Sequence, residues 1–278
     1  MNFVLLVNKT KNKTSRDMVN ELNHIFDMKK IGHTGTLDPI ATGILVMCGG
    51  RYTKLIDKLS FLDKEYIAEI KIGIKTDTGD ITGTIIEEKE CNTTIDEIKQ
   101  VLNHVKGKYE QIIPAYSATK VNGKKLYEYA RNNEEVPVIK NVVNINDLEL
   151  ISYKNNIITI KCSVSKGTYI RSIIQTICDN LNIIGTMNSL IRTKQGPFSI
   201  DESYTIEEIR NGNYKFLDIK ELLNINIYKL NEEEYFKVKN GNSITINNDE
   251  EELLLIYKNE YIAIYKKENE LYKPEIMF

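Results

Sequence analysis

The chain has 278 residues, 41% of them hydrophobic and 27% charged, and its formal net charge is −2. This length and composition support one large domain, or one large and one small, and exclude an intrinsically disordered class. The four cysteines and three histidines show no CxxC pair or other metal-ligand spacing, so we expect no metal site and no disulfide framework. No secretory signal is visible, and the apolar run at 44–48 is too short to span a bilayer, which favours a cytoplasmic protein without membrane contact.

The first predicted elements are a strand, a helix and a second strand. The apolar run at 3–7 predicts a buried strand, and Ser15 begins a helix whose apolar residues recur at helical spacing. Alternating residues at 66–74 predict the second strand, and 83–88 is expected to be its hairpin partner across a polar turn. The helix and the second strand are separated by an unusual loop at 29–39.

The middle of the chain continues to interleave helices and strands. Thr94 is placed to cap a helix, the run at 157–165 alternates like a strand, and a further helix is predicted from Arg171. Because hairpins dominate the strand connections, we predict an α+β fold with a mixed, mainly antiparallel sheet flanked by helices.

The C-terminal part differs from the rest in charge and pattern. From Asn231 onward, eleven acidic residues face six lysines, so this tail carries a net charge of −5 and leaves a mildly basic remainder. Three short strand-like runs lie there, divided by Asn, Asp and Glu: 243–247, 252–258 and 260–267. We therefore predict a main domain over 1–228 and a small β module over 229–278 that packs on it.

The loop "KKIGHTGTLDP" at 29–39 concentrates residues with special properties. Pro39 restricts Asp38 to extended dihedral angles, and Gly32 and Gly35 permit a bulky ligand to approach the backbone. A nucleophilic aspartate must be ionised and rigidly held, and Arg171, just past a predicted strand, is a candidate for the cation beside it. The alternative is that Asp38 and Pro39 only start a turn.

Several motifs together resemble one family. "GHTGTLDPIATGIL" at 32–45 closely resembles the active-site motif of the TruB-type tRNA pseudouridine synthases, in which the aspartate of the "LDP" step is the nucleophile. Four further stretches follow in the family's order and spacing, and the resemblance covers residues 3 to about 200: 63–80, 113–131, 165–173 and 190–192.

This resemblance implies a pseudouridine synthase fold with a short PUA-like C-terminal module. It implies isomerisation of a flipped-out uridine in the T loop of tRNA, at the position numbered 55 in tRNA, without cofactor or metal. Asp38 would be the catalytic nucleophile, and Lys9 and Asp80 would support the site. Five residues would contact the substrate or complete its pocket: His33 in the space left by the flipped nucleotides, Tyr66 and Tyr169 beside the uracil, Leu190 closing the pocket, and Arg171 paired with Asp38.

The same residues have plainer interpretations. His33 could cap a turn, Tyr66 and Tyr169 could be core residues on strands, and Asp80 suits a hairpin turn. Leu190 is apolar and carries no signal of its own.

A basic segment with interleaved tyrosines lies at 117–140. Four cations there are candidates for contacts with RNA phosphates: Lys120, Lys124, Lys125 and Arg131. The resemblance indicates a mobile RNA-binding arm, and the alternative is a solvated helix.

Two departures from the family pattern concern the ends of the chain. Thr10 and Asn12 stand where the family's "KPxGxTS" motif has proline and glycine, and the acidic tail makes a contribution of the β module to tRNA binding doubtful.

We expect the T-arm of tRNA to be the partner of a monomer that needs no other protein. A guide-RNA-dependent H/ACA-type synthase subunit, which would lack the long arm, and a non-catalytic tRNA-folding chaperone remain alternatives.

Overall fold

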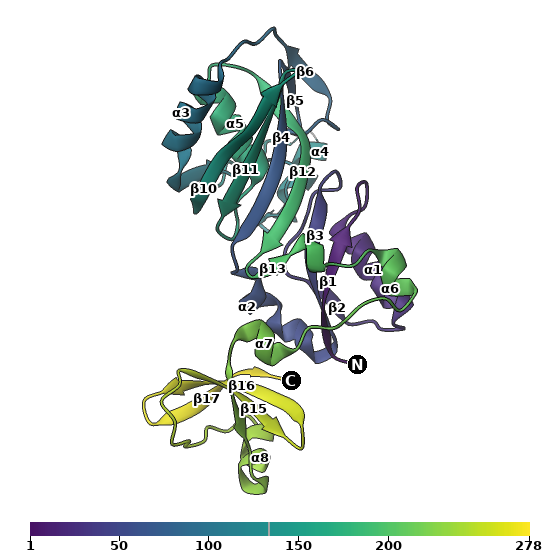
Figure 1. The fold of residues 1–278 in the computed structure, drawn as a ribbon, viewed down its shortest axis with the longest axis vertical. Coiled ribbons are helices and arrows are strands. Elements are labelled where there is room, and N and C mark those ends of the chain that lie inside the picture. Colours follow the sequence, from purple (N-terminus) through teal and green to yellow (C-terminus); the bar gives the residue numbers. More distant parts are fainter. Residues whose placement is uncertain (133) are drawn as a thin grey trace.

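The computed structural model describes residues 1–132 and 134–278. Nine strands form the main sheet: β1 (Phe3–Lys9), β2 (Ile31–His33), β3 (Thr42–Gly49), β4 (Lys64–Ile72), β7 (Gly107–Ile112), β10 (Lys140–Lys154), β11 (Ile157–Val164), β12 (Gly185–Gln195) and β13 (Phe198–Ser199). Their order is β1-β3-β12-β4-β11-β10-β7, with β2 beside β3 and β13 beside β12 (Figure 1). Within the described part of this sheet, only β12 and β3 pair in parallel, so the predicted α+β class with a mixed, mainly antiparallel sheet is confirmed.

Three of the described helices, those that begin near Ser15, Thr94 and Arg171, form where capping residues and apolar spacing predict them. Their bounds are α1 (Ser15–Ile25), η1 (Gly50–Leu55), α2 (Ile56–Ser60), α3 (Ile95–Val105), α4 (Leu126–Arg131), α5 (Ile170–Asn180), η2 (Ile200–Glu202), α6 (Ile206–Arg210), α7 (Ile219–Leu223) and α8 (Glu232–Lys239). Thr14 and Thr94 begin α1 and α3 with capping boxes, and α5 starts one residue before the predicted Arg171. None of the described helices is long and apolar enough to cross a membrane.

Two halves of the main sheet meet at a narrow junction. The strands β1, β2 and β3 form one half and β4, β10 and β11 belong to the other, with β12 between them (Figure 1). The parallel pairing joins only Thr42 to Ile191 and Gly43 to Arg192. Gly43 has φ +107°, and a Cβ there would lie 2.2 Å from the Arg192 carbonyl oxygen, so the junction requires glycine. The loop that carries Asp38 ends directly at this junction.

Two small hairpins project from the main sheet. They are formed by β5 (Ile74–Thr76) with β6 (Ile85–Glu88), and by β8 (Lys120–Val121) with β9 (Lys124–Lys125). The expected pairing of 83–88 with 66–74 is wrong for most of its length, because β4 lies between β11 and β12 and only β5 meets β6. Gly73 has φ +88° and separates β4 from β5. Asn133, inside the expected arm at 117–140, lies outside the described residues.

The C-terminal sheet has four strands. They are β14 (Asn226–Lys229), β15 (Glu252–Tyr257), β16 (Glu260–Glu268) and β17 (Leu271–Met277), in that order. The strand expected at 243–247 is wrong: Ile244 makes only an isolated bridge to Tyr272. Sequence inspection missed β17, which contains Pro274 and lies at the sheet edge, where proline is tolerated. The sheet also includes β14, which begins before the expected boundary at 229.

This C-terminal sheet packs on the half of the main sheet that holds β1 and β3. Val4 and Leu6 of β1 share a buried apolar cluster with Leu254 and Ile264 of the small sheet. The Lys58 ammonium of α2 lies 2.7 Å from the Glu252 carboxylate. Removing the module would therefore expose apolar surface on β1 and β3.

Candidate active site

The Asp38 loop connects β2 to β3 and is fixed on both sides of the aspartate. The Ser15 hydroxyl, at the start of α1, accepts a hydrogen bond from the Leu37 N–H at 2.9 Å and lies 3.4 Å from the Leu37 carbonyl oxygen. The Pro39 carbonyl accepts hydrogen bonds from the Lys9 ammonium at 3.2 Å and from the Asn12 N–H at 2.8 Å. Asp38 thus sits between two anchored neighbours, which gives the rigidity that a reactive carboxylate needs.

Lys9 and Asn12 make this anchor possible. Lys9 is fully buried, and its ammonium also donates to the carbonyls of Thr10 and Lys13 at 3.0 and 2.6 Å. Burial lowers the pKa of Lys9 to about 8, against the opposing attraction of the Asp38 charge. Asn12 has φ +65°, a left-handed conformation that asparagine tolerates, so the chain keeps the turn where the family motif has glycine.

The structure places Arg171 directly against Asp38. The guanidinium Nε lies 3.0 Å from Asp38 Oδ2, and Nη2 lies 3.1 Å from Oδ1, so the pair is bidentate. The Arg171 side chain is 6% exposed and that of Asp38 is 29% exposed. The carboxylate is therefore oriented from the protein side while part of it faces solvent, where a substrate can reach it.

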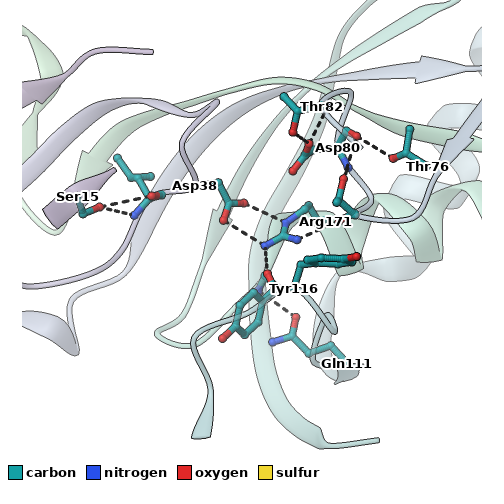
Figure 2. A network of polar contacts seen from close by, with 11 residues as sticks. Ser15, Asp38, Thr76, Asp80, Thr82, Gln111, Tyr116 and Arg171 are labelled. Carbon is teal, nitrogen blue, oxygen red and sulfur yellow. Dashed lines mark hydrogen bonds and ion pairs between the residues drawn. The ribbon is translucent and has the colours of Figure 1, made fainter. Parts of the chain in front are cut away.

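Arg171 also holds two backbone segments near the aspartate. Its Nη1 donates to the Thr78 carbonyl and its Nη2 to the Tyr116 carbonyl, each at 3.0 Å (Figure 2). Thr78 lies in the turn between β5 and β6, and Tyr116 lies at the root of the basic arm. A cavity of about 380 Å³ opens beside Arg171 and is bordered by Thr78 and Tyr109. The guanidinium therefore fixes the aspartate, the turn and the arm root together.

Tyr66 and Leu190 lie in the apolar core beneath the Asp38 loop. Tyr66 of β4 and Leu190 of β12 are 7% and 5% exposed, and both belong to the buried cluster that includes Leu37 and Ile40. Burial raises the pKa of the Tyr66 phenol. Both side chains are thus close to the loop, and their contact with a base stays a prediction.

Tyr169 and His33 stand at different edges of the site. Tyr169 is not on a strand; it precedes α5 as its N-cap, and its hydroxyl lies 2.9 Å from the Thr119 hydroxyl. His33 ends β2, and burial lowers its pKa, with the charges of Arg192 and Arg16 acting in the same direction. Its buried Nδ1 has no hydrogen-bond partner within the described part of the chain. The Nδ1 atom is enclosed by the protein, and contact of His33 with a nucleotide stays a prediction.

Asp80 and the arm residues make mainly local contacts. The Asp80 carboxylate accepts hydrogen bonds from the Thr82 N–H and hydroxyl, within its own turn. In the arm, Lys120 and Arg131 are exposed. Lys124 and Lys125 lie on β9 rather than on the helix, and the Lys124 ammonium is 2.5 Å from the Glu134 carboxylate. The charge of Lys124 is therefore already paired in this structure.

Two buried polar residues near the site escaped sequence reasoning. Arg192 is 1% exposed, and its Nε donates to the Ile44 carbonyl at 2.7 Å. It lies two residues after Leu190 on β12 and faces the same side, so strand alternation was an available signal. Gln111 is fully buried on β7 and lies on the same face of this strand as Tyr109.

Comparisons with known proteins identify relatives of this chain. A family described as "TruB family pseudouridylate synthase (N terminal domain)" matches residues 23–170. The chain is 41% identical to "tRNA pseudouridine synthase B" of Caldanaerobacter subterraneus subsp. tengcongensis, over 99% of this chain and 98% of the relative. It is 44% identical to the Bacillus subtilis protein of the same name, over 75% and 70%.

Solved structures of proteins with lower sequence identity share the fold. A Cbf5-Nop10-Gar1 complex contains a chain with TM-score 0.73 and 18% identity, over 99% of this chain and 84% of that one. An H/ACA RNP bound to a substrate RNA containing 2'-deoxyuridine gives TM-score 0.72 and 17% identity, with the same coverage. From the sequence relatives and the family match together, the chain belongs to the TruB family of pseudouridylate synthases and is an isomerase.

Proposed function

We propose that this protein converts a uridine in the T loop of tRNA, the position numbered 55 in tRNA, to pseudouridine, with Asp38 as the nucleophile. The observation that carries the proposal is the Asp38–Arg171 pair, an anchored and partly exposed carboxylate held by a buried guanidinium. The relatives named tRNA pseudouridine synthase B support tRNA as the substrate. The protein acts in the cytoplasm as a monomer.

The reaction rearranges atoms without adding or removing any. The bond between N1 of uracil and C1′ of the ribose breaks, the base turns, and a bond forms between C5 and C1′ while the proton on C5 is lost and N1 gains one. The Asp38 carboxylate acts on the ribose, either by attack on C1′ or by a route through a sugar alkene. The residues present supply a fixed anion and aromatic walls for this chemistry.

Access to the ribose requires the target nucleotide to leave its stack. Flipping a base costs a few kcal/mol, and the cost is smaller in a loop than in a duplex. Tyr66 and Tyr169 flank the uracil, Leu190 closes the pocket, and His33 fills the space that the nucleotide leaves. Lys120 and Arg131 of the arm contact phosphates.

The arm favours this function over the two alternatives. Residues 117–140 form a segment that a guide-RNA-dependent subunit is not expected to carry, and the anchored carboxylate has no purpose in a chaperone. The test is tritium release from a T-arm hairpin labelled at C5 of uridine, without guide RNA, beside a hairpin with cytidine at the target position. Release from the uridine hairpin alone supports the proposal. No release from either hairpin would leave tRNA folding as the function, and release only after addition of a guide RNA would indicate the H/ACA-type role.

A further inference from the structure

The turn before α5 carries two residues of the proposed site. Tyr169 is the N-cap residue of α5, and Arg171 lies in the first turn of this helix. The first backbone N–H groups of a helix have no acceptor within the helix and need one from elsewhere. The Tyr169 side chain makes no capping hydrogen bond. Gly167, two residues earlier, has φ +82°. The position of the Arg171 guanidinium therefore depends on whatever holds this turn.

Gln111 of β7 holds both ends of the turn. Its side-chain Nε2 donates to the Gly167 carbonyl at 2.8 Å, and its Oε1 accepts from the Tyr169 N–H at 3.0 Å. The side chain is fully buried, so water cannot replace either bond. Asn141, its neighbour on β10, adds a second donor to the Gly167 carbonyl at 3.2 Å. Within the described part of the chain, Gln111 is the partner of the Tyr169 N–H.

We propose that Gln111 is a positioning residue for the Asp38–Arg171 pair and for Tyr169. It touches neither the substrate nor Asp38, and it acts by fixing where α5 begins. A misplacement of about 1 Å at a reacting group can cost about a hundredfold in rate, so the buried amide that joins both ends of this turn affects catalysis through the position of Arg171. This inference rests on the proposed function, because activity is one of its two readouts.

The test compares volume-matched and amide-retaining variants. Gln111→Met keeps the volume and removes both hydrogen bonds, whereas Gln111→Asn keeps an amide that is one methylene too short to reach both partners. Gln100→Met, the same change at an exposed glutamine of α3, is the control. The measurements are single-turnover rate at saturating T-arm RNA, RNA affinity, and amide hydrogen exchange across residues 165–172.

We expect the rate of Gln111→Met to fall by about ten- to a hundredfold with unchanged RNA affinity, and exchange at Tyr169 to become faster. Gln111→Asn should rank between this variant and the wild type, which keeps the test valid if Gln111→Met does not fold. A folded Gln111→Met or Gln111→Asn protein with wild-type rate and exchange would overturn the inference, and so would a loss confined to RNA affinity. A wild-type protein without activity, but with the exchange difference, would refute the proposed function and leave the positioning intact.

Discussion

The pocket around Asp38 and the basic arm hold their charges in opposite ways. In the pocket, Lys9, Arg171 and Arg192 are buried, and each donates to backbone carbonyls at fixed positions. In the arm, Lys120 and Arg131 are exposed, and each ammonium or guanidinium can move with its flexible stem. Buried charges that are fixed by hydrogen bonds can orient a reacting group. Exposed charges on flexible side chains can adjust to the positions of RNA phosphates.

Because of this difference, we expect the pocket to determine the reaction rate and the arm to determine the affinity for RNA. A pocket charge acts over a few ångströms in a region that salt barely screens, while an exposed charge acts through counterion release and depends on ionic strength. We therefore expect pocket variants to change the chemical step and arm variants to change binding and its salt dependence. Four predictions test this division.

The largest effect is expected for Asp38→Asn. An amide cannot serve as a nucleophile, so product should fall to trace levels, while RNA binding should remain because the phosphate contacts lie elsewhere. Asp57→Asn, at an exposed aspartate of α2, is the matched control and should behave as the wild type. Pseudouridine well above trace levels from a sequence-verified, undeamidated Asp38→Asn protein would falsify the central role of this residue.

The next effect concerns Arg171. Arg171→Lys keeps the charge but loses the planar fork that meets both carboxylate oxygens, and we expect a rate loss of about a hundredfold. Arg171→Ala should be slower still, because Asp38 then loses its partner and two backbone carbonyls lose their donors. Arg210→Lys, in a surface ion pair with Glu21, is the control and should change little. Equal rates for Arg171→Lys and the control would place Arg171 outside the catalytic centre.

A smaller effect is expected for the arm. Replacing Lys120 and Arg131 together with alanine should weaken T-arm binding and flatten the plot of log affinity against log salt by somewhat under two units, since each lost phosphate contact contributes about 0.7–0.9. The rate at saturating RNA should not change. Lys124→Ala should flatten the slope less, because Glu134 already pairs that charge.

The matched control for the arm lies in the acidic C-terminal module. Lys239 and Lys258 each stand over a tyrosine ring, as Lys124 does in the arm, and their replacement with alanine should leave the slope unchanged. Point variants are preferable to truncation, because the module covers apolar surface behind β1 and β3. A larger change in slope from Lys239 and Lys258 than from Lys120 and Arg131 would show that the module holds the RNA.

The smallest effect concerns Lys9 and pH. Its pKa is lowered to about 8, so the neutral amine formed above that pH has two protons for three carbonyls, and the Pro39 anchor loosens. We expect a rate decline of a few-fold above about pH 8 that is absent in Lys9→Met. Because the folded pKa lies below the unfolded one, the titration of Lys9 itself raises stability between about pH 8 and 10.5, so the decline should occur without unfolding. An identical decline in Lys9→Met would assign it to another group.

The parts of the site that depend on residues adjacent in the sequence could be predicted from it. The Asp-Pro step and its glycines identify a rigid loop, and the helix start near Arg171 follows from apolar spacing. Arg171 was a candidate for the cation beside Asp38 from its place after a predicted strand, and the family resemblance singled it out, because 133 residues separate the two and no local pattern joins them. Gln111 and Arg192 were missed because a buried polar residue reveals its purpose only through partners on other strands.

The errors in the fold have similar causes. Residues 243–247 alternate as a strand should, but alternation does not ensure a partner strand. In this segment only Ile244 forms a bridge, to Tyr272. The edge strand β17 was overlooked because its charged residues and Pro274 obscure the pattern. The pairing of 83–88 was misjudged because Gly73 ends β4 and lets a separate short strand form.

The most direct test of the account is a structure of this protein bound to a T-arm hairpin with 5-fluorouridine at the target position. We expect the flipped fluorinated base between Tyr66 and Tyr169, with its ribose against the Asp38 carboxylate and Arg171 still paired to that carboxylate. A target base that stays stacked in the loop, or that lies in a pocket away from Asp38, would contradict it.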